Sequence, residues 1–196
     1  AYANKVVIFI RIAFNLALEW EIAGIEKNPA TKMKLLEENN KIQRYLSKEE
    51  AGRLIQAVKN SKNRILEYIV PFLILTGARK SEAFKAKWSE FDLDAGVWTI
   101  PVSKSGKARH IPISDHLGIL LGQIPQGSIY LFPSPRTGKP FNSIYQAWNN
   151  ARIAAGLANV RMHDLRHTFA SALVNSGRSL FEVQQLLGHS DIHVTQ

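Results

Sequence analysis

The stretch "GVWTIPVSKSGKARHIPIS", Gly96 to Ser114, decides the class of fold. Its two ends, "GVWTIPV" and "RHIPIS", alternate apolar and polar side chains with a period of two, which is typical of strands. The segment "SKSGK" between them has the glycine and small polar residues of a turn. We therefore expect an antiparallel hairpin here, in a chain whose other periodic segments are helical.

A third short strand is predicted at "IYLF", residues 129–132, before the turn residues "PSPRTGKP". The segment "SKEE", Ser47 to Glu50, has the pattern of a capping box, and Thr76 is expected to cap a later helix. Helices are predicted over residues 3–23, 64–75 (bent or ended by Pro71), 142–155, 164–175 and 180–187. The sequence thus predicts an α+β fold, mainly helical with one small antiparallel β-sheet.

Composition limits the class of protein. The chain has 196 residues, 45% of them hydrophobic, which is enough for an ordinary core. It has no cysteine, which removes disulfides, zinc–thiolate sites and cysteine nucleophiles and fits a reducing compartment. Its longest apolar run, residues 68–75, is too short to cross a bilayer. We expect a cytoplasmic protein with no membrane partner, and because the chain starts at Ala1 with no leader, a piece of a longer protein.

Charge points to a polyanionic partner. Lys and Arg number 25 against 16 Asp and Glu, which gives a formal net charge of +9. A surplus of this size favours nucleic acid, because neutralising phosphates releases counterions and drives association. Composition alone leaves open a basic protein that binds no specific nucleic acid.

The stretch "RMHDLRHTF", residues 161–169, gathers two histidines and two arginines. On a helix, His163 and Arg166 lie on one face and His167 is one turn from His163. Histidines four apart are also the spacing of helical zinc sites, but the cation of Arg166 would repel a metal ion. For His167 alone, a hydrogen-bonded buried ring is the simpler interpretation. The residues by themselves leave a phosphate or plain solvent facing this group.

Three further motifs are weak when taken singly. Arg79 in "TGARKSE" sits at a predicted helix start, where backbone N–H groups favour an anion. The hairpin cations Lys104, Lys107 and Arg109 have no acidic residue near them in sequence, so the hairpin is either a solvated edge or a finger for a DNA groove. In "LGHSDIHVTQ", a glycine helix end is followed by His189 in a loop.

Taken in order, "TGARKSE", the hairpin lysine, "HDLRHTFAS" and "LGHSDIHVT" resemble the motifs of the tyrosine recombinases, the phage integrase family. The resemblance runs from about Tyr45 to the last residue. The segment "AFNLALEWEIAGIEKNPA" resembles the final helix of that family's core-binding domain. The resemblance implies that residues 1–30 end a DNA-binding domain, residues 31–45 are a linker, and residues 46–196 form the catalytic domain.

The resemblance also implies roles. Arg79 and Arg166 would clamp the oxygens of a scissile DNA phosphate, which suits the geometry of guanidinium groups. His163 would be the acid/base partner of the nucleophile, His189 a further donor to the phosphate, and Lys104 the general acid for the leaving 5′-oxygen. The remaining implied residues are Glu82 and His167, which would support these groups, and the DNA-contacting cations Lys107, Arg109, Arg136, Lys139 and Arg161.

The family's nucleophile is a tyrosine in a T-x-x-Y pattern. Here Thr195 and Gln196 fit the start of that pattern, so we expect the tyrosine two positions beyond Gln196. The tyrosines of the chain, Tyr2, Tyr45, Tyr68, Tyr130 and Tyr145, do not occupy the motif. The 196 residues are therefore expected to be inactive for cleavage.

The resemblance implies a DNA integrase of a phage or mobile element that cuts and rejoins DNA through a 3′-phosphotyrosyl intermediate, with no cofactor and no metal. Its expected partners are double-stranded DNA with attachment sites, a homotetramer formed on DNA, and accessory DNA-bending proteins. Two alternatives stay open: a catalytically inactive DNA-binding regulator of the same fold, and an enzyme like the type IB topoisomerases.

Overall fold

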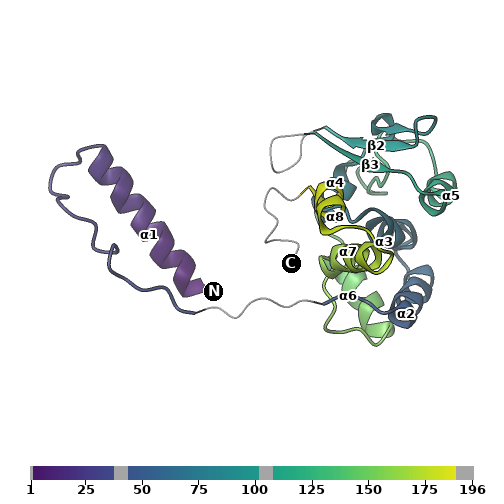
Figure 1. Ribbon diagram of the computed structural model, residues 1–196, viewed down its shortest axis with the longest axis horizontal. Coiled ribbons are helices and arrows are strands. Elements are labelled where there is room, and N and C mark those ends of the chain that lie inside the picture. Colours follow the sequence, from purple (N-terminus) through teal and green to yellow (C-terminus); the bar gives the residue numbers. More distant parts are fainter. Residues whose placement is uncertain (1, 38–43, 102–107, 189–196) are drawn as a thin grey trace. The chain divides into compact units, whose positions relative to one another are not determined.

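The protein, seen here as a computed structural model, is described over residues 2–37, 44–101 and 108–188. It divides into two compact units, Ala1–Ile42 and Gln43–Gln196 (Figure 1). None of the helices in these described ranges has the length and apolar character needed to span a membrane.

The first unit contains helix α1, Tyr2–Glu19. The predicted helix reached residue 23, but α1 ends earlier because Glu21 takes a left-handed conformation, with φ of 52°. The side chain of Asn4 exchanges two 2.8 Å hydrogen bonds with the backbone of Leu36. Arg11 donates to two carbonyl groups of the following loop. Polar side chains of α1 thus hold the segment that follows it, residues 30–36, against the helix.

The second unit begins with a capped helix. Ser47 accepts the backbone N–H of Glu50 at 3.2 Å, and the Glu50 carboxylate accepts that of Ser47 at 3.0 Å. This arrangement is the capping box predicted from "SKEE". Hydrogen bonds from Arg44 and from the Ser47 backbone lower the pKa of Glu50 to about 2.

Helices make up most of the second unit (Figure 1). The predicted helices 164–175 and 180–187 are confirmed at both ends, the one at 64–75 continues through Pro71, and the one at 142–155 begins three residues later than expected. The helix of residues 115–123 was not predicted. The elements are α2 Lys48–Lys59, α3 Ile65–Thr76, α4 Lys80–Lys85, the short 3-10 helix η1 Trp88–Glu90, α5 Asp115–Gln123, α6 Tyr145–Ala154, α7 Asp164–Asn175 and α8 Leu180–Leu187.

The sheet has the order β1–β2–β3, with both pairs antiparallel. Its strands are β1 Phe91–Asp92, β2 Val97–Ile100 and β3 Arg109–Pro112. Strands β2 and β3 confirm the predicted hairpin, with Trp98 opposite Ile111. The fold class predicted from the sequence, α+β and mainly helical, is therefore confirmed.

The third strand is not where the sequence placed it. Residues 129–132 make only one isolated bridge, between Lys87 and Tyr130, and lie outside the sheet. The backbone of Leu131 bonds to Ala86 at 2.8 Å instead, and the side chains of Leu131 and Phe132 are fully buried. The second half of "IYLF" is therefore apolar because it packs in the core, and β1 is the third strand.

Helix α3 is the centre of the core. Its buried side chains include Leu66, Ile69 and Leu73. Phe72 links this helix to the sheet, because its ring lies 5.0 Å from that of Trp98 and 5.1 Å from that of Phe132, centroid to centroid. Aromatic packing thus fixes α3 against the hairpin.

The turn after α3 corrects another prediction. Thr76 does not cap the next helix but ends α3, where its hydroxyl donates to the Phe72 carbonyl at 2.7 Å. Gly77 follows in a left-handed conformation, with φ of 60°. Arg79, not Thr76, is the N-cap residue of α4. A left-handed glycine thus lets two helices meet within three residues, and this turn delivers Arg79 to the surface of α7 and α8 described below.

Gly77→Ala should lower the free energy of unfolding by about 1–3 kcal/mol, measured by urea denaturation. An L-residue is strained at this φ, and a Cβ atom here would overlap the Phe169 ring. The matched control is Gly52→Ala in α2, where a Cβ meets nothing within 4 Å. That change should raise stability by up to about 1 kcal/mol. Equal effects of the two substitutions would contradict the steric argument.

Candidate active site

The N-terminus of α7 is anchored from two sides. Asp164 is fully buried and accepts the backbone N–H of Arg161 at 2.7 Å. The hydroxyl of Thr168 donates to the Asp164 carbonyl at 2.9 Å and accepts the backbone N–H of Leu46 at 3.0 Å. These bonds hold the first turn of α7, and with it the side chains of the "HDLRHTF" motif.

Arg166 projects from that turn into the interior. Its side chain is 4% exposed, Nη1 donates to the Gly77 carbonyl at 2.7 Å, and Nη2 donates to the Leu187 carbonyl at 2.5 Å. Burial, together with the nearby cations of Arg79 and Arg109, lowers the pKa of Arg166 to about 9. The guanidinium group remains protonated at neutral pH, but its positive charge is poorly compensated.

Arg79 reaches the same place from the turn before α4. Its Nη2 donates to the Gly188 carbonyl at 3.3 Å, next to the carbonyl that Arg166 contacts. Its Nη1 forms an ion pair with Glu82 at 2.8 Å, and its backbone N–H donates to the other oxygen of Glu82 at 2.7 Å. Arg79 and Arg166, far apart in the sequence, thus converge on the C-terminal end of α8.

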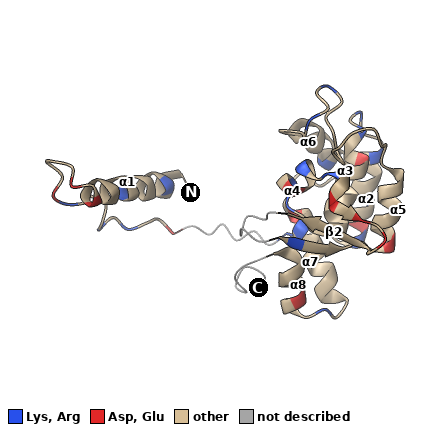
Figure 2. Ribbon diagram, turned by 90° about the horizontal axis from the view of Figure 1, so that it is seen from above, with Lys and Arg blue, Asp and Glu red and all other residues tan. Residues whose placement is uncertain are grey.

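Arg109, the first residue of β3, is buried in this cluster, whereas the sequence analysis grouped it with the DNA-contacting cations of the hairpin. Its Nη2 pairs with Glu82 at 2.8 Å, and its Nη1 donates to the Leu187 carbonyl. Figure 2 shows α4 beside the sheet, and the bond from Arg109 to Glu82 joins the two. Burial and the charge of Arg79 lower the pKa of Arg109, while Glu82 opposes that effect.

One carboxylate serves the whole cluster. Glu82 is largely buried, and burial alone would raise its pKa. The neighbouring cations of Arg109 and Arg79 outweigh that effect, so that the pKa of Glu82 lies below its ordinary value. Among the described residues, Glu82 is the acidic partner of both Arg79 and Arg109. With Arg166 beside them, three guanidinium groups share a single negative charge. The cluster keeps a surplus of positive charge and suits an anion.

The two histidines of the motif lie at the rim of this site. His163 is exposed and immediately precedes α7, and its ring meets that of His167 edge-on, with centroids 5.1 Å apart. Partial desolvation of its ring lowers the pKa of His163, and His167 and the Arg166 cation lower it as well. Desolvation also lowers the pKa of His167, although Asp164 opposes it. Both rings therefore favour the neutral form at neutral pH.

The other implied DNA contacts are spread over the second unit. Arg161 is half-exposed and forms an ion pair with Asp164 at 2.6 Å. Arg136 and Lys139 lie on an exposed turn that the 2.8 Å bond from Ser134 N–H to the Lys139 carbonyl closes. Three implied residues, Lys104, Lys107 and His189, lie outside the described residues.

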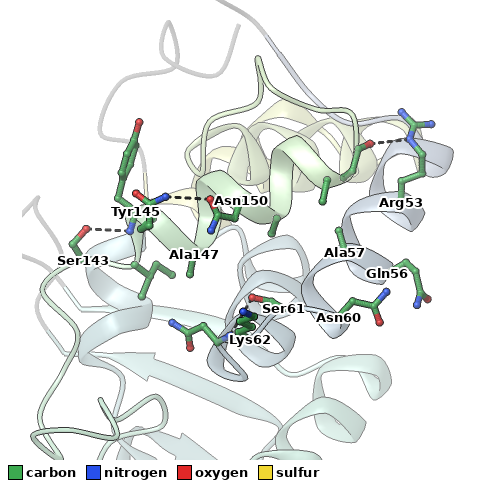
Figure 3. Close-up of a pocket in the computed structure, with 16 residues that line it drawn as sticks. Arg53, Gln56, Ala57, Asn60, Ser61, Lys62, Ser143, Tyr145, Ala147 and Asn150 are labelled. Carbon is green, nitrogen blue, oxygen red and sulfur yellow. Dashed lines mark hydrogen bonds between the residues drawn. The ribbon is translucent and has the colours of Figure 1, made fainter.

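Two connected hollows lie along α6. One, of about 280 Å³, is lined by Lys80, Arg152, Arg161 and the start of α6. It shares residues 143–145 with a larger groove of about 1100 Å³ between α2 and α6. Figure 3 shows that groove, with amides such as Asn60 and Asn150 and the cations Arg53 and Lys62 on its walls. Neither hollow was predicted from the sequence.

The burial of Arg109 was also missed, although the sequence holds a signal for it. In "RHIPIS", Arg109 has the parity of Ile111, which is buried, while His110 and Pro112 are exposed. A period of two therefore places the guanidinium on the core face of β3. The acid that pairs with Arg109 is Glu82, which comes from another element and is distant in sequence.

Solved structures share this architecture. The catalytic domain of the bacteriophage HP1 integrase superposes with a TM-score of 0.63 at 32% identity, over 77% of this chain and 83% of that one. The XerA recombinase gives a TM-score of 0.65 at 31% identity, over 78% of this chain and 58% of that one. A lambda integrase dimer bound to a COC′ core site gives 0.78 at 20% identity, over 98% and 73%, a likeness of fold.

Sequence relatives agree. The integrase of Haemophilus phage HP1 is 31% identical over 202 residues, which cover all of this chain and 54% of that relative. Tyrosine recombinase XerC of Xanthomonas campestris is 30% identical over 184 residues, or 88% of this chain and 56% of the relative. The chain thus spans just over half the length of these curated relatives. The phage integrase family matches residues 44–196, nearly the whole second unit. The chain belongs to the phage integrase family.

Proposed function

We propose that the protein containing this chain is a site-specific DNA recombinase that cuts and rejoins DNA by transesterification. The observation that carries the proposal is the convergence of Arg79 and Arg166 at the end of α8 with uncompensated positive charge. A phosphodiester undergoing substitution gathers negative charge on its non-bridging oxygens. Preorganised guanidinium donors stabilise that charge as it develops.

The roles follow from the donors that remain. A guanidinium group has five N–H donors, and the contacts of Arg166 with Gly77 and Leu187 use two of its nitrogen atoms without exhausting them. We assign the clamp on the scissile phosphate to Arg79 and Arg166, and the orientation of Arg79 to Glu82. His163, kept neutral, takes the proton of the attacking hydroxyl.

The proposal extends to residues outside the described ranges. Lys104 is assigned as the general acid that protonates the leaving 5′-oxygen, and His189 as a further donor to the phosphate. The nucleophile is assigned to a tyrosine two positions beyond Gln196, which forms a 3′-phosphotyrosyl link that a 5′-hydroxyl later reverses. The substrate is double-stranded DNA with attachment sites, bound by a homotetramer, with DNA-bending proteins as accessory partners.

The first unit fits a DNA-gripping domain. Helix α1 exposes several large apolar side chains, among them Phe9 at 74%, and Trp20 directly after the helix is 68% exposed. A helix of this kind usually packs inside a larger domain. We propose that residues 1–30 end a core-binding domain and that residues 31–45 link it to the catalytic domain.

The deciding experiment uses the full-length protein and a nicked suicide DNA substrate that traps the covalent complex. Peptide mapping should find the label on a tyrosine just after Gln196. A label on a serine would overturn the tyrosine mechanism. No covalent complex would favour the non-catalytic regulator, and relaxation of supercoiled DNA without strand exchange would favour an enzyme like the type IB topoisomerases.

Arg166→Lys should separate chemistry from binding. The lysine keeps the charge but loses the planar fork, so the cleavage rate of the bound complex should fall by about 10²–10³-fold while the Kd for DNA changes little. Arg136→Ala, on the exposed turn, should instead weaken binding and reduce the slope of log Kd against log salt by about 1. Rates and affinities are measured by suicide cleavage and fluorescence anisotropy. A proportional loss of both quantities in Arg166→Lys would contradict the clamp.

The second-order rate constant for cleavage, measured at limiting DNA, should follow the protonation state of His163 in the free protein. Because the folded-state pKa of this ring is lowered, the neutral base persists below the ordinary histidine pKa of about 6.5. We expect a constant rate from pH 8 down to about 6.5 and a decline only at lower pH. His163→Gln should remove this decline. A midpoint above pH 7 in the parent protein would contradict the assignment.

A further inference from the structure

Arg109 occupies an unusual place for a cation of a DNA-binding protein. Its side chain is 5% exposed, and its backbone is fixed in β3 opposite Ile100 of β2. Unlike Arg166, which donates to backbone carbonyl groups, Arg109 pairs its charge with the largely buried carboxylate of Glu82. Its burial costs free energy that a pair of charges recovers only in part. The contacts of Arg109 therefore call for a function other than binding DNA.

Those contacts join the partners of the two clamp arginines. Nη2 of Arg109 holds Glu82, which also holds Arg79. Nη1 of Arg109 donates to the Leu187 carbonyl, which also accepts Nη2 of Arg166. Arg109 thus touches the support of each clamp arginine at once.

The geometry around Glu82 shows what Arg109 adds. One carboxylate oxygen takes Nη1 of Arg79, and the other takes the Arg79 backbone N–H and Nη2 of Arg109. With cations on both oxygens, the carboxylate plane is fixed. Without Arg109, the second oxygen of Glu82 would keep only the backbone N–H of Arg79, and the carboxylate that orients the Arg79 guanidinium would be held less firmly.

The end of α8 rests on Arg109. Gly188 ends this helix in a left-handed conformation with φ of 65°, and a Cβ atom there would lie 2.8 Å from Cδ and 2.9 Å from Nη1 of Arg109. Figure 1 shows α4, α8 and β3 close together, and hydrogen bonds join them. The carbonyl groups of Leu187 and Gly188, which orient Arg166 and Arg79, therefore sit on the buried guanidinium.

The cluster is also short of acceptors. Within the described part of the chain, the buried Nε of Arg109 has no hydrogen-bond partner. A buried donor without a partner lowers the stability of the fold by about 1–3 kcal/mol, so stability alone does not explain an arginine at this position. This fits a group retained for the site that it supports.

Building on the proposed recombinase function, we propose that Arg109 is a positioning residue for strand cleavage. It braces Glu82 and the C-terminal end of α8, so that Arg79 and Arg166 present their free donors to one phosphate. It does not contact DNA. Through Arg109, strand β3 thereby holds Glu82 and the end of α8 in place.

The test compares Arg109→Met, Arg109→Lys and Arg64→Met in the full-length protein. Met keeps the length of the side chain but removes charge and donors, and Lys keeps the charge. Arg64 is the matched control, because its side chain is 79% exposed and its carboxylate contact with Glu67 is long, at 3.8 Å. Each variant is assayed for the rate constant of suicide cleavage at saturating DNA, for the Kd and its salt dependence, and for urea unfolding.

Arg109→Met should lower the cleavage rate constant by about 10²-fold, the effect of a displacement of about 1 Å at a reacting centre. Its Kd and salt slope should match the parent, Arg109→Lys should recover part of the rate, and Arg64→Met should behave as the parent. A lower reaction amplitude with an unchanged rate constant would reduce Arg109 to a stability residue and overturn the proposal. A weaker Kd with a shallower salt slope would make it a DNA contact and also overturn it.

Two further observations keep the outcome decisive. If Arg109→Met does not fold, Arg109→Lys alone decides, because its rate constant must fall while its Kd stays unchanged. Combined with Glu82→Gln, Arg109→Lys should add less than its separate effect, since both changes release the same carboxylate contact; full additivity would overturn the bracing role. If the parent protein forms no covalent complex, the recombinase function itself is refuted. If the parent cleaves and Arg109→Met cleaves equally well, only the bracing role of Arg109 is refuted.

Discussion

The carboxylate of Glu82 is the interaction on which the candidate site depends. It lies between the guanidinium groups of Arg79 and Arg109, with the cation of Arg166 close by. Like charges this close repel strongly in a poorly solvated interior, so their assembly needs a negative group inside it. A single carboxylate brings the arginines together yet leaves positive charge over. That imbalance is what distinguishes an anion site from a structural ion pair.

The rest of the fold places these groups with short connections. Helix α3 fills the core and ends in the Gly77 turn, whose carbonyl takes one donor of Arg166 and whose next residues present Arg79. Helix α7 starts from the buried Asp164, and α8 ends where both arginines find carbonyl groups. The sheet contributes through β3. The site is thus made at a junction of element ends, where backbone carbonyl groups are not used up by helical bonding.

Sequence reasoning predicted the local features best. The capping box at Ser47, the hairpin, and the bounds of α7 and α8 follow from residue periodicity and helix-end chemistry. The errors arose where tertiary contacts decide: Leu131 and Phe132 of "IYLF" are buried against the core outside the sheet, and Thr76 ends one helix instead of starting another. For the site, the motifs pointed to Arg79, Glu82 and Arg166, which do come together. The depth of Arg109 depends on an acid from another element, so counting neighbours along the chain could not reveal it, whereas strand parity could have.

The end of α8 carries an implication for how the site responds to disturbance. Carbonyl groups from two consecutive residues there accept hydrogen bonds from arginines of three different elements. Loosening that final turn would therefore remove one hydrogen bond from each of these side chains at the same time. Cleavage activity should then depend on whether the last turn of α8 is formed, with an active and an inactive state and no gradual decline between them.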